Sequence, residues 1–161
     1  MKMFRPVRRK KSEISIDAAK QLLHTVRRGI LAVNGEDGYP YAMPLNFLYD
    51  EENVKIYFHG ARAGYKIDAI RACDKVCFTV YGSEAIKDEK TWAPYVQSAV
   101  VFGRCRFVED DAEKKVLLKR LAMKYFPAES IADEEIARSG DKAQVFEITI
   151  EHMTGKEVQE R

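Results

Sequence analysis

Residues 54–66, VKIYFHGARAGYK, join a strand pattern directly to the start of a helix. The first half alternates with a period of two, which is typical of a strand buried on one face. The glycines that follow end the strand, and a short helix is expected from about Tyr65 to Ala72. The alternation predicts one face with Val54, Ile56 and Phe58 and an opposite face with Lys55, Tyr57 and His59.

The turn between this strand and this helix has the composition of an anion-binding site. Glycines let the backbone approach a ligand closely, and a helix N-terminus presents free N–H groups. His59, Arg62 and Lys66 add cationic or hydrogen-bonding side chains. The combination suits a phosphate dianion, although the spacing is neither that of a Walker A loop nor that of a Rossmann fingerprint. On spacing alone, a glycine-containing loop with solvated charges explains the segment equally well.

The residues before this stretch predict a helix followed by a β-meander. Ser15 is a suitable N-cap, and apolar residues at helical spacing predict a helix from Ser15 to Arg28. Asn-Gly and Asp-Gly pairs in residues 34–38 are strong hairpin signals. The expected strands are Gly29 to Val33, Tyr39 to Tyr49 and Val54 to His59.

A proline interrupts the second of these strands, in the sequence AMPLNF of residues 42–47. Pro44 cannot donate a ladder hydrogen bond, so it indicates an edge, a bulge or a backbone that serves a ligand. Asn46 places an amide within an apolar run. An edge strand with a backbone-bonded Asn46 is an equally good interpretation of these residues.

The residues after the stretch alternate between strands and helices. Strands are expected over Val76 to Tyr81, Ala99 to Val108 and Ala143 to Ile150, and helices over Asp110 to Phe126 and Ile131 to Ser139. Hairpin-like connections favour a mainly antiparallel sheet, closed or partly closed into a barrel with helices outside. A loop before the fifth strand carries Trp92, Tyr95 and Ser98, which suit a planar heterocycle or, alternatively, an anchor for the loop.

Length and composition predict one domain over residues 1–161, with a net charge of +2 and a basic arm over residues 1–13. We expect the arm to be frayed and solvated and expect no nucleic-acid partner. The three cysteines form no CxxC pair, and no metal-ligand spacing is present. No signal-peptide or membrane-spanning run is visible, so a cytoplasmic location is expected. His24 and His152 are interpreted as structural or exposed.

Six motifs carry a family resemblance through their order and spacing. They are GEDGYPY (35–41), MPLNF (43–47), IYFHGA (56–61), GYK (64–66), SAVVFG (98–103) and EHMTGK (151–156). Together they resemble the FMN-binding split-barrel family related to pyridoxamine 5′-phosphate oxidase, and within it the nitroimidazole-resistance branch. The resemblance implies a mainly β (α+β) fold: a six- to seven-stranded antiparallel split β-barrel of Greek-key type with flanking helices.

The resemblance also implies a homodimer that binds FMN at the subunit interface. The residues it assigns to the cofactor are Met43, Pro44, Leu45, Asn46, Phe47, His59, Gly60, Ala61, Lys66, Tyr95, Ser98 and Val100. Tyr95 and Ser98 would come from the partner subunit. His59 is also the candidate catalytic residue, since it is the histidine that lies beside other cationic groups.

The activity implied is hydride transfer from NAD(P)H through FMN to a small electrophilic acceptor, with nitroaromatic compounds among the candidates. The chain lacks the Arg-rich C-terminal segment of pyridoxamine-phosphate oxidase and ends instead in VQER, residues 158–161, which argues against vitamin B6 oxidation. Two alternatives stay open. One is a flavin-binding store or sensor without turnover, and the other is a haem-handling member of the same superfamily.

Overall fold

The structure is a computed structural model, and it describes residues 3–160. Seven antiparallel strands form one sheet in the order β2-β1-β5-β6-β7-β4-β3. The strands are β1 (Gly29–Asn34), β2 (Pro40–Leu45), β3 (Leu48–Asp50), β4 (Lys55–Gly60), β5 (Lys75–Ala85), β6 (Tyr95–Val108) and β7 (Gln144–Gln159). The helices are α1 (Ile16–Thr25), α2 (Tyr65–Ala72), α3 (Asp111–Tyr125) and α4 (Glu129–Ser139), with short 3-10 turns at Lys10–Ser12, Glu36–Gly38 and Gly140–Lys142.

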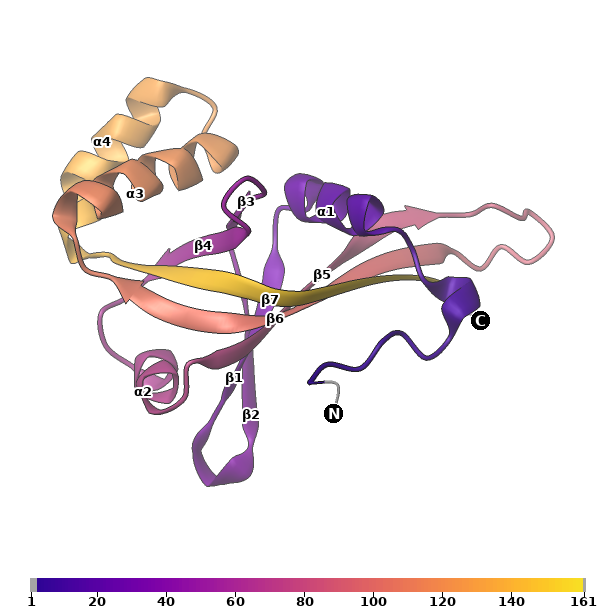
Figure 1. Cartoon of the computed structure of the whole chain (residues 1–161). Helices are drawn as coiled ribbons and strands as arrows, with labels where there is room; N and C mark the ends of the chain where they lie inside the picture. Colours follow the sequence, from indigo (N-terminus) through magenta and orange to yellow (C-terminus); the bar gives the residue numbers. More distant parts are fainter. Residues whose placement is uncertain (1–2, 161) are drawn as a thin grey trace.

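The two edge strands of the sheet, β2 and β3, follow each other in the chain. Only Asn46 and Phe47 separate them, so the end of one edge must lie beside the start of the other. The sheet therefore curls into a barrel with an open seam, and the helices lie outside it (Figure 1). This confirms the expected antiparallel split barrel.

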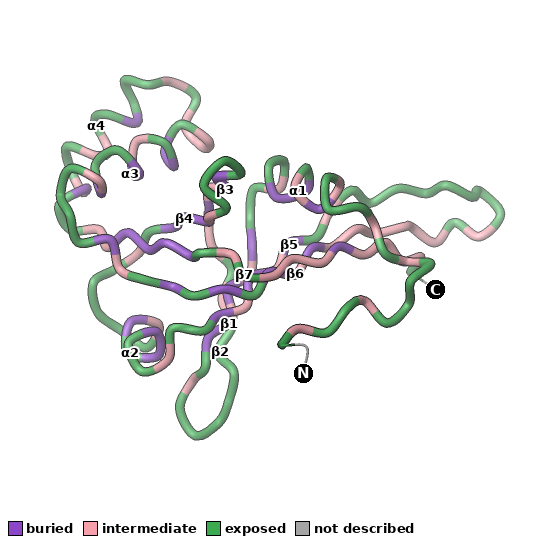
Figure 2. The backbone as a smooth tube through the Cα atoms, in the orientation of Figure 1, coloured by how far each residue is buried: buried purple, intermediate pink, exposed green. Residues whose placement is uncertain are grey.

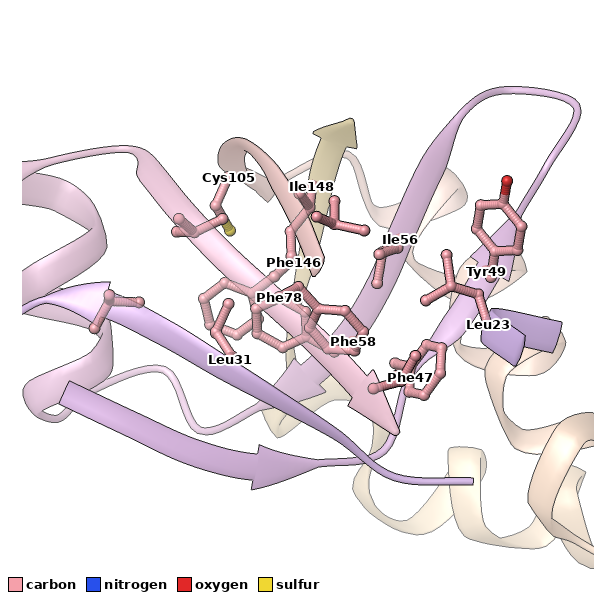
Figure 3. Close-up of a cluster of buried hydrophobic side chains, with 14 of the residues drawn as sticks. Leu23, Leu31, Phe47, Tyr49, Ile56, Phe58, Phe78, Cys105, Phe146 and Ile148 are labelled. Atoms are coloured by element: carbon pink, nitrogen blue, oxygen red, sulfur yellow. The ribbon is translucent and has the colours of Figure 1, made fainter. Parts of the chain in front are cut away.

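Aromatic side chains fill the interior of the barrel. Phe58 and Phe146 stack with ring centroids 4.6 Å apart, and Phe47 meets Phe78 edge-on at 4.9 Å. These four rings are fully buried and point toward one another from β4, β7, β5 and the β2–β3 corner (Figure 3). Burial is concentrated in the central strands, whereas the hairpin tips are exposed (Figure 2).

A second, smaller cluster lies between the outer face of the sheet and α3. It contains Tyr57 from β4 together with Val108, Leu117, Leu118 and Val145. The expected alternation is correct within β4, since Phe58 faces the barrel interior and Tyr57 faces the helix, but Val54 precedes the strand and is 49% exposed. This arrangement places the next residue of the Tyr57 face, His59, on the side of α3 and α4.

The structure differs from the expected elements where contacts between residues distant in the sequence determine the boundaries of the strands. The strand expected over Tyr39 to Tyr49 is split into β2 and β3 at the corner. Strands β6 and β7 are longer than expected because they pair with each other along nearly their whole length. The pairing runs from Tyr95 opposite Gln159 to Val108 opposite Val145. Tyr95 and Ser98 consequently lie in a strand and not in a loop.

The described part of the basic arm contacts the sheet through Phe4, while its basic side chains are exposed, as expected for a solvated arm. The ring of Phe4 stacks on His152 with centroids 4.8 Å apart and on Phe102 at 5.8 Å, so the arm packs against the sheet. His152, expected at an exposed terminus, lies inside β7, and its Nε2 atom is buried without a hydrogen-bond partner among the described residues. The prediction failed because β7 extends well beyond Ile150.

None of the helices in residues 3–160 has the length and apolar character needed to cross a membrane. The assignment of residues 1–161 to one domain and the cytoplasmic location stay predictions.

Candidate functional site

The loop that joins β4 to α2 forms the rim of the barrel. Gly64 is the N-cap of α2 and has a φ of 127°, a conformation that side chains with a Cβ rarely adopt. No side chain caps this helix. The backbone N–H groups of its first turn are thus available to a ligand. The helix occupies Tyr65–Ala72, as the sequence predicted.

Lys66 lies in this first turn and turns its ammonium group toward the barrel. Its Nζ lies 5.3 Å from the ring centroid of Phe146 and 5.7 Å from that of Phe58. Burial lowers the pKa of Lys66. Within the described residues this ammonium has no hydrogen bond to an acceptor and no ion pair. A half-buried cation beside a helix N-terminus is a suitable partner for an anion.

Gly60 leaves room for this ammonium group. A Cβ atom at Gly60 would lie 2.7 Å from Nζ of Lys66, closer than such atoms approach. The absence of a side chain at the end of β4 therefore keeps a place for the ammonium group. Ala61 follows and is exposed. Gly60 and Lys66 were both among the predicted site residues, and the structure brings them together.

His59 and Asn46 line a shared cavity on the side of α3 and α4. The pKa of His59 is lowered, first because surrounding protein atoms desolvate the ring and second because Lys66 is positively charged. The imidazole is therefore neutral at pH 7 and carries one donor and one acceptor. His59 faces away from the barrel interior and lines the cavity, and its contact with the cofactor stays a prediction.

The remaining predicted residues of β2 divide between two faces. Met43 and Leu45 are half-buried and pack against the barrel core, whereas Pro44 is exposed on the outer face. Directly paired residues of neighbouring strands share a face. Two of the predicted site residues, Pro44 and Val100, lie in one such row. The row crosses five strands through Pro44, Ile30, Thr79, Val100 and Thr154.

Tyr95 and Ser98 lie at the start of β6, whereas Lys66 lies near the end of this strand. The contacts of Lys66 are with Phe58 and Phe146, and Phe146 pairs with Phe107 of β6. The rise of an extended strand puts Ser98 roughly 25–30 Å along β6 from Phe107. The assignment of Tyr95 and Ser98 to a partner subunit stays a prediction.

Three residues near the rim have roles that sequence patterns did not indicate. Arg62, grouped with the phosphate site in the sequence, donates a hydrogen bond to the carbonyl oxygen of Asp141 instead. Lys124 and Tyr125, at the end of α3, hold the backbone of Phe47 at the β2–β3 corner. Tyr125 falls within the helix expected over Asp110 to Phe126, but no local signal names its partner.

The fold defines a class: antiparallel split-barrel proteins with flanking helices. A family model described as pyridoxamine 5′-phosphate oxidase matches residues 15–157, so the chain belongs to that family.

Solved structures show the same fold. A candidate 5-nitroimidazole antibiotic resistance protein from Bacteroides thetaiotaomicron superposes with a TM-score of 0.76 at 21% identity, covering 90% of this chain and 86% of that chain. An FAD-binding protein from Mesorhizobium loti gives 0.67 at 24% identity, covering 91% and 97%. The FAD binding protein from Mycobacterium smegmatis gives 0.64 at 18% identity, covering 93% and 100%. No curated protein matches the chain significantly in sequence.

Proposed function

We propose that the chain is a flavoprotein that binds FMN, with the phosphate held by Lys66 and by the first turn of α2. The observation that carries this proposal is the half-buried ammonium of Lys66, which has no anionic partner among the described residues. A phosphate dianion supplies the missing charge, and the free N–H groups of the helix supply its hydrogen bonds.

The names of similar structures support a flavin. The proteins from Mesorhizobium loti and Mycobacterium smegmatis are both named as FAD-binding. FMN is proposed here because the lysine and the helix N-terminus suit a terminal phosphate dianion. The backbone of Met43 to Phe47 would then lie along the isoalloxazine ring, beside Gly60 and Ala61.

A homodimer would complete this site. The outer face of the sheet carries Pro44, Ile30 and Val100 in one row, and Phe102 on the same face is 39% exposed beside the stacked ring of Phe4. A second copy packed on this face would bring its own Tyr95 and Ser98 to the flavin. The long separation of Ser98 from Lys66 within one chain supports this arrangement.

The proposed reaction is reduction of a small electrophilic acceptor at the expense of NAD(P)H. Bound FMN supplies the capacity to accept and donate hydride. The chain itself fixes the phosphate through Lys66 and surrounds the ring with the apolar residues of β2. His59, which is neutral at pH 7, presents a hydrogen-bonding group to the acceptor.

An FMN titration of the purified protein tests the proposal. We expect a yellow protein whose flavin absorbance is bleached by NADH or NADPH. Lys66→Met should weaken FMN binding about tenfold or more, because a hydrogen bond to a charged group contributes roughly 1.5–3 kcal/mol. Lys75→Met, at an exposed lysine, is the matched control.

The outcomes separate the alternatives. A protein that takes up neither FMN nor FAD contradicts the proposal. If FAD binds more tightly than FMN, the cofactor is FAD and not FMN. Tight FMN that neither nicotinamide reduces would identify a flavin store or sensor, and a Soret band after addition of haem would identify a haem protein. A monomer that binds FMN as tightly as a dimer would contradict the shared site.

A further inference from the structure

A groove of about 420 Å³ lies between the N-terminal arm and the last strand of the sheet. The arm contributes Arg9, Lys11 and Ser12, and the sheet contributes Tyr95 from β6 and Val158 from β7. Figure 1 shows the turn of the arm beside the C-terminal end of β7. The groove is therefore at the start of β6, at the opposite end of this strand from the lysine of the β4–α2 loop.

Backbone contacts fix the arm in this position. The N–H of Ser12 donates to the carbonyl oxygen of Arg9 at 2.9 Å and closes a 3-10 turn. The N–H of Ile14 donates to the carbonyl oxygen of Gly155 in β7 at 3.1 Å. Gly155 leaves room for this crossing, because a Cβ atom there would lie 2.6 Å from the side chain of Ile14. The groove is thus preformed, and a ligand does not have to order the arm.

The carboxylates that line the groove already have partners. Glu13 pairs with Lys10 at 2.9 Å. Glu157 pairs with Lys87 at 2.7 Å and accepts a hydrogen bond from Gln97 at 3.0 Å. Each negative charge is balanced locally, so neither carboxylate repels an anion in the groove with its full charge.

The two cations that line the groove have no such partners. Within residues 3–160, the side chains of Arg9 and Lys11 make no ion pair and donate no hydrogen bond, and the hydroxyl group of Ser12 makes no hydrogen bond either. A ligand in the groove would therefore meet two positive charges and one hydroxyl group. Charged nitrogen donors with a neighbouring hydroxyl group suit a phosphate.

The size of the groove indicates more than a bare ion. Its volume lies within the range of roughly 300–1,000 Å³ that is typical of pockets for small organic ligands. Ile14, Tyr95 and Val158 supply apolar surface beside the cations. A ligand that fills the groove thus combines a phosphate with an organic part.

We propose that this groove binds a phosphate monoester of a small organic molecule. The phosphate lies against Arg9, Lys11 and Ser12, and the organic part lies against Tyr95 and Val158. Two sources share this chemistry: the 2′-phosphate of NADP(H) and a free phosphorylated compound. A role in binding NADP(H) rests on the proposed function, whereas binding of a phosphate monoester does not.

Calorimetric titration with phenyl phosphate tests the groove. It is carried out on wild type and on Lys66→Met, so that an anion bound at the proposed flavin site is recognised. At about 0.15 M salt, which screens long-range attraction between exposed charges, both proteins should bind phenyl phosphate and neither should bind phenol. Binding that disappears in Lys66→Met would overturn the inference.

Two double variants of the arm provide the matched comparison, each made in the Lys66→Met protein. Arg9→Gln with Lys11→Gln removes both cations of the groove and should weaken phenyl phosphate at least tenfold. Arg5→Gln with Arg8→Gln removes two charges from the same arm outside the groove and should bind like its parent. Circular dichroism checks that each variant is folded.

NADP⁺ and NAD⁺ separate the two sources of the phosphate, since they differ only in the 2′-phosphate. NADP⁺ bound about tenfold more tightly than NAD⁺, with the difference lost when Arg9 and Lys11 are changed, would assign the groove to the coenzyme. Equal affinities, with phenyl phosphate still bound, would assign it to a free phosphate monoester.

Three further results would overturn the inference. The first is no binding of phenyl phosphate, and the second is an equal effect of the two double variants, which would show a diffuse attraction to the arm. The third is a loss of FMN affinity when Arg9 and Lys11 are changed in wild type, which would assign the groove to the flavin. A protein that binds phenyl phosphate through Arg9 and Lys11 but takes up no flavin would contradict the proposed function alone.

Discussion

Nζ of Lys124 lies 3.0 Å from the carbonyl oxygen of Phe47 and 3.7 Å from the centroid of the Phe47 ring. The same ammonium donates to the carbonyl of Val26, at 2.9 Å, just beyond the end of α1. One side chain therefore joins α1, α3 and the corner between β2 and β3. Because this corner brings the two edge strands together, Lys124 stabilises the seam of the barrel.

Tyr125→Phe should destabilise the protein by about 1–3 kcal/mol, the cost of leaving a buried polar group unsatisfied. The Tyr125 hydroxyl accepts a hydrogen bond from the backbone N of Phe47 at 2.8 Å, and Phe47 is fully buried. Urea unfolding measures the loss. Tyr39→Phe, at a tyrosine that is 75% exposed, should change stability by less than about 0.5 kcal/mol. Equal effects of the two changes would show that the hydroxyl of Tyr125 is dispensable.

The lowered pKa of Lys124 predicts that the free energy of unfolding rises with pH in the alkaline range. Burial, and then the charge of Arg27, lower its pKa to about 8. In the unfolded chain the pKa is about 10.4, so between these values the unfolded state binds more protons and the free energy of unfolding increases with pH. The gain is at most a few kcal/mol, since one pKa unit corresponds to about 1.4 kcal/mol.

The comparison with Lys124→Met isolates this effect from other groups that titrate in the same range. The difference in unfolding free energy between wild type and variant should grow in favour of wild type from pH 8 to pH 10.4. The neutral amine keeps its N–H donors, so the contacts with Phe47 and Val26 persist. Parallel stability curves for the two proteins would contradict the assignment.

Local signals in the sequence predicted the parts of the structure that local contacts decide. Ser15 caps α1 through its hydroxyl, as expected, and Asp110, where a helix was expected to begin, caps α3 through its carboxylate. The loop between β4 and α2 was likewise predictable, because Gly60, Gly64 and Lys66 lie within seven residues of one another.

The corner and the cavity were not predictable in this way. The bond between Lys124 and Phe47 joins residues 77 positions apart, and no pattern around either residue names the other. The break in the expected strand at Asn46 depends on where the sheet closes. Similarly, the length of β7 is set by its pairing with β6, and this pairing moved His152 from a terminus to the interior of a strand.

Glu147→Gln should destabilise the protein by up to several kcal/mol at pH 7. This carboxylate is only 2% exposed and bonds to Lys55 at 2.8 Å and to Arg106 at 2.8 and 2.9 Å. Removing its charge leaves the two cations without their buried partner, a loss that reaches about 3–5 kcal/mol for fully buried pairs. Glu151→Gln breaks a surface pair with Arg104 and should cost about 0–1 kcal/mol.

The pH dependence provides a second check on Glu147. Burial works to raise its pKa, but the hydrogen bonds from Arg106 and Lys55 outweigh burial and lower it. A carboxylate with a lowered pKa stabilises the fold above the unfolded value of about 4.3, and this contribution is lost as the pH falls through the folded value. The destabilisation caused by Glu147→Gln should therefore shrink below pH 4. A constant difference down to pH 2 would rule out this source of stability.

Gly60→Ala should weaken FMN binding through Lys66. The added Cβ would lie 2.7 Å from Nζ, and the next nearest atom is Cε of the same side chain at 3.6 Å. Because the obstructing atom is the end of a flexible chain, Lys66 can move aside, and stability should fall little. The displaced ammonium would no longer lie where the proposed phosphate binds, so affinity should drop about tenfold, as for Lys66→Met.

A double-mutant cycle separates this mechanism from a direct clash with the flavin. If Gly60→Ala acts only by displacing the ammonium, it should have almost no further effect in the Lys66→Met background, where that group is absent. FMN affinity is measured by fluorescence quenching in all four proteins. Additive losses would show that Gly60 approaches the ligand itself, because its own Cβ would then exclude the flavin whether or not Lys66 is present.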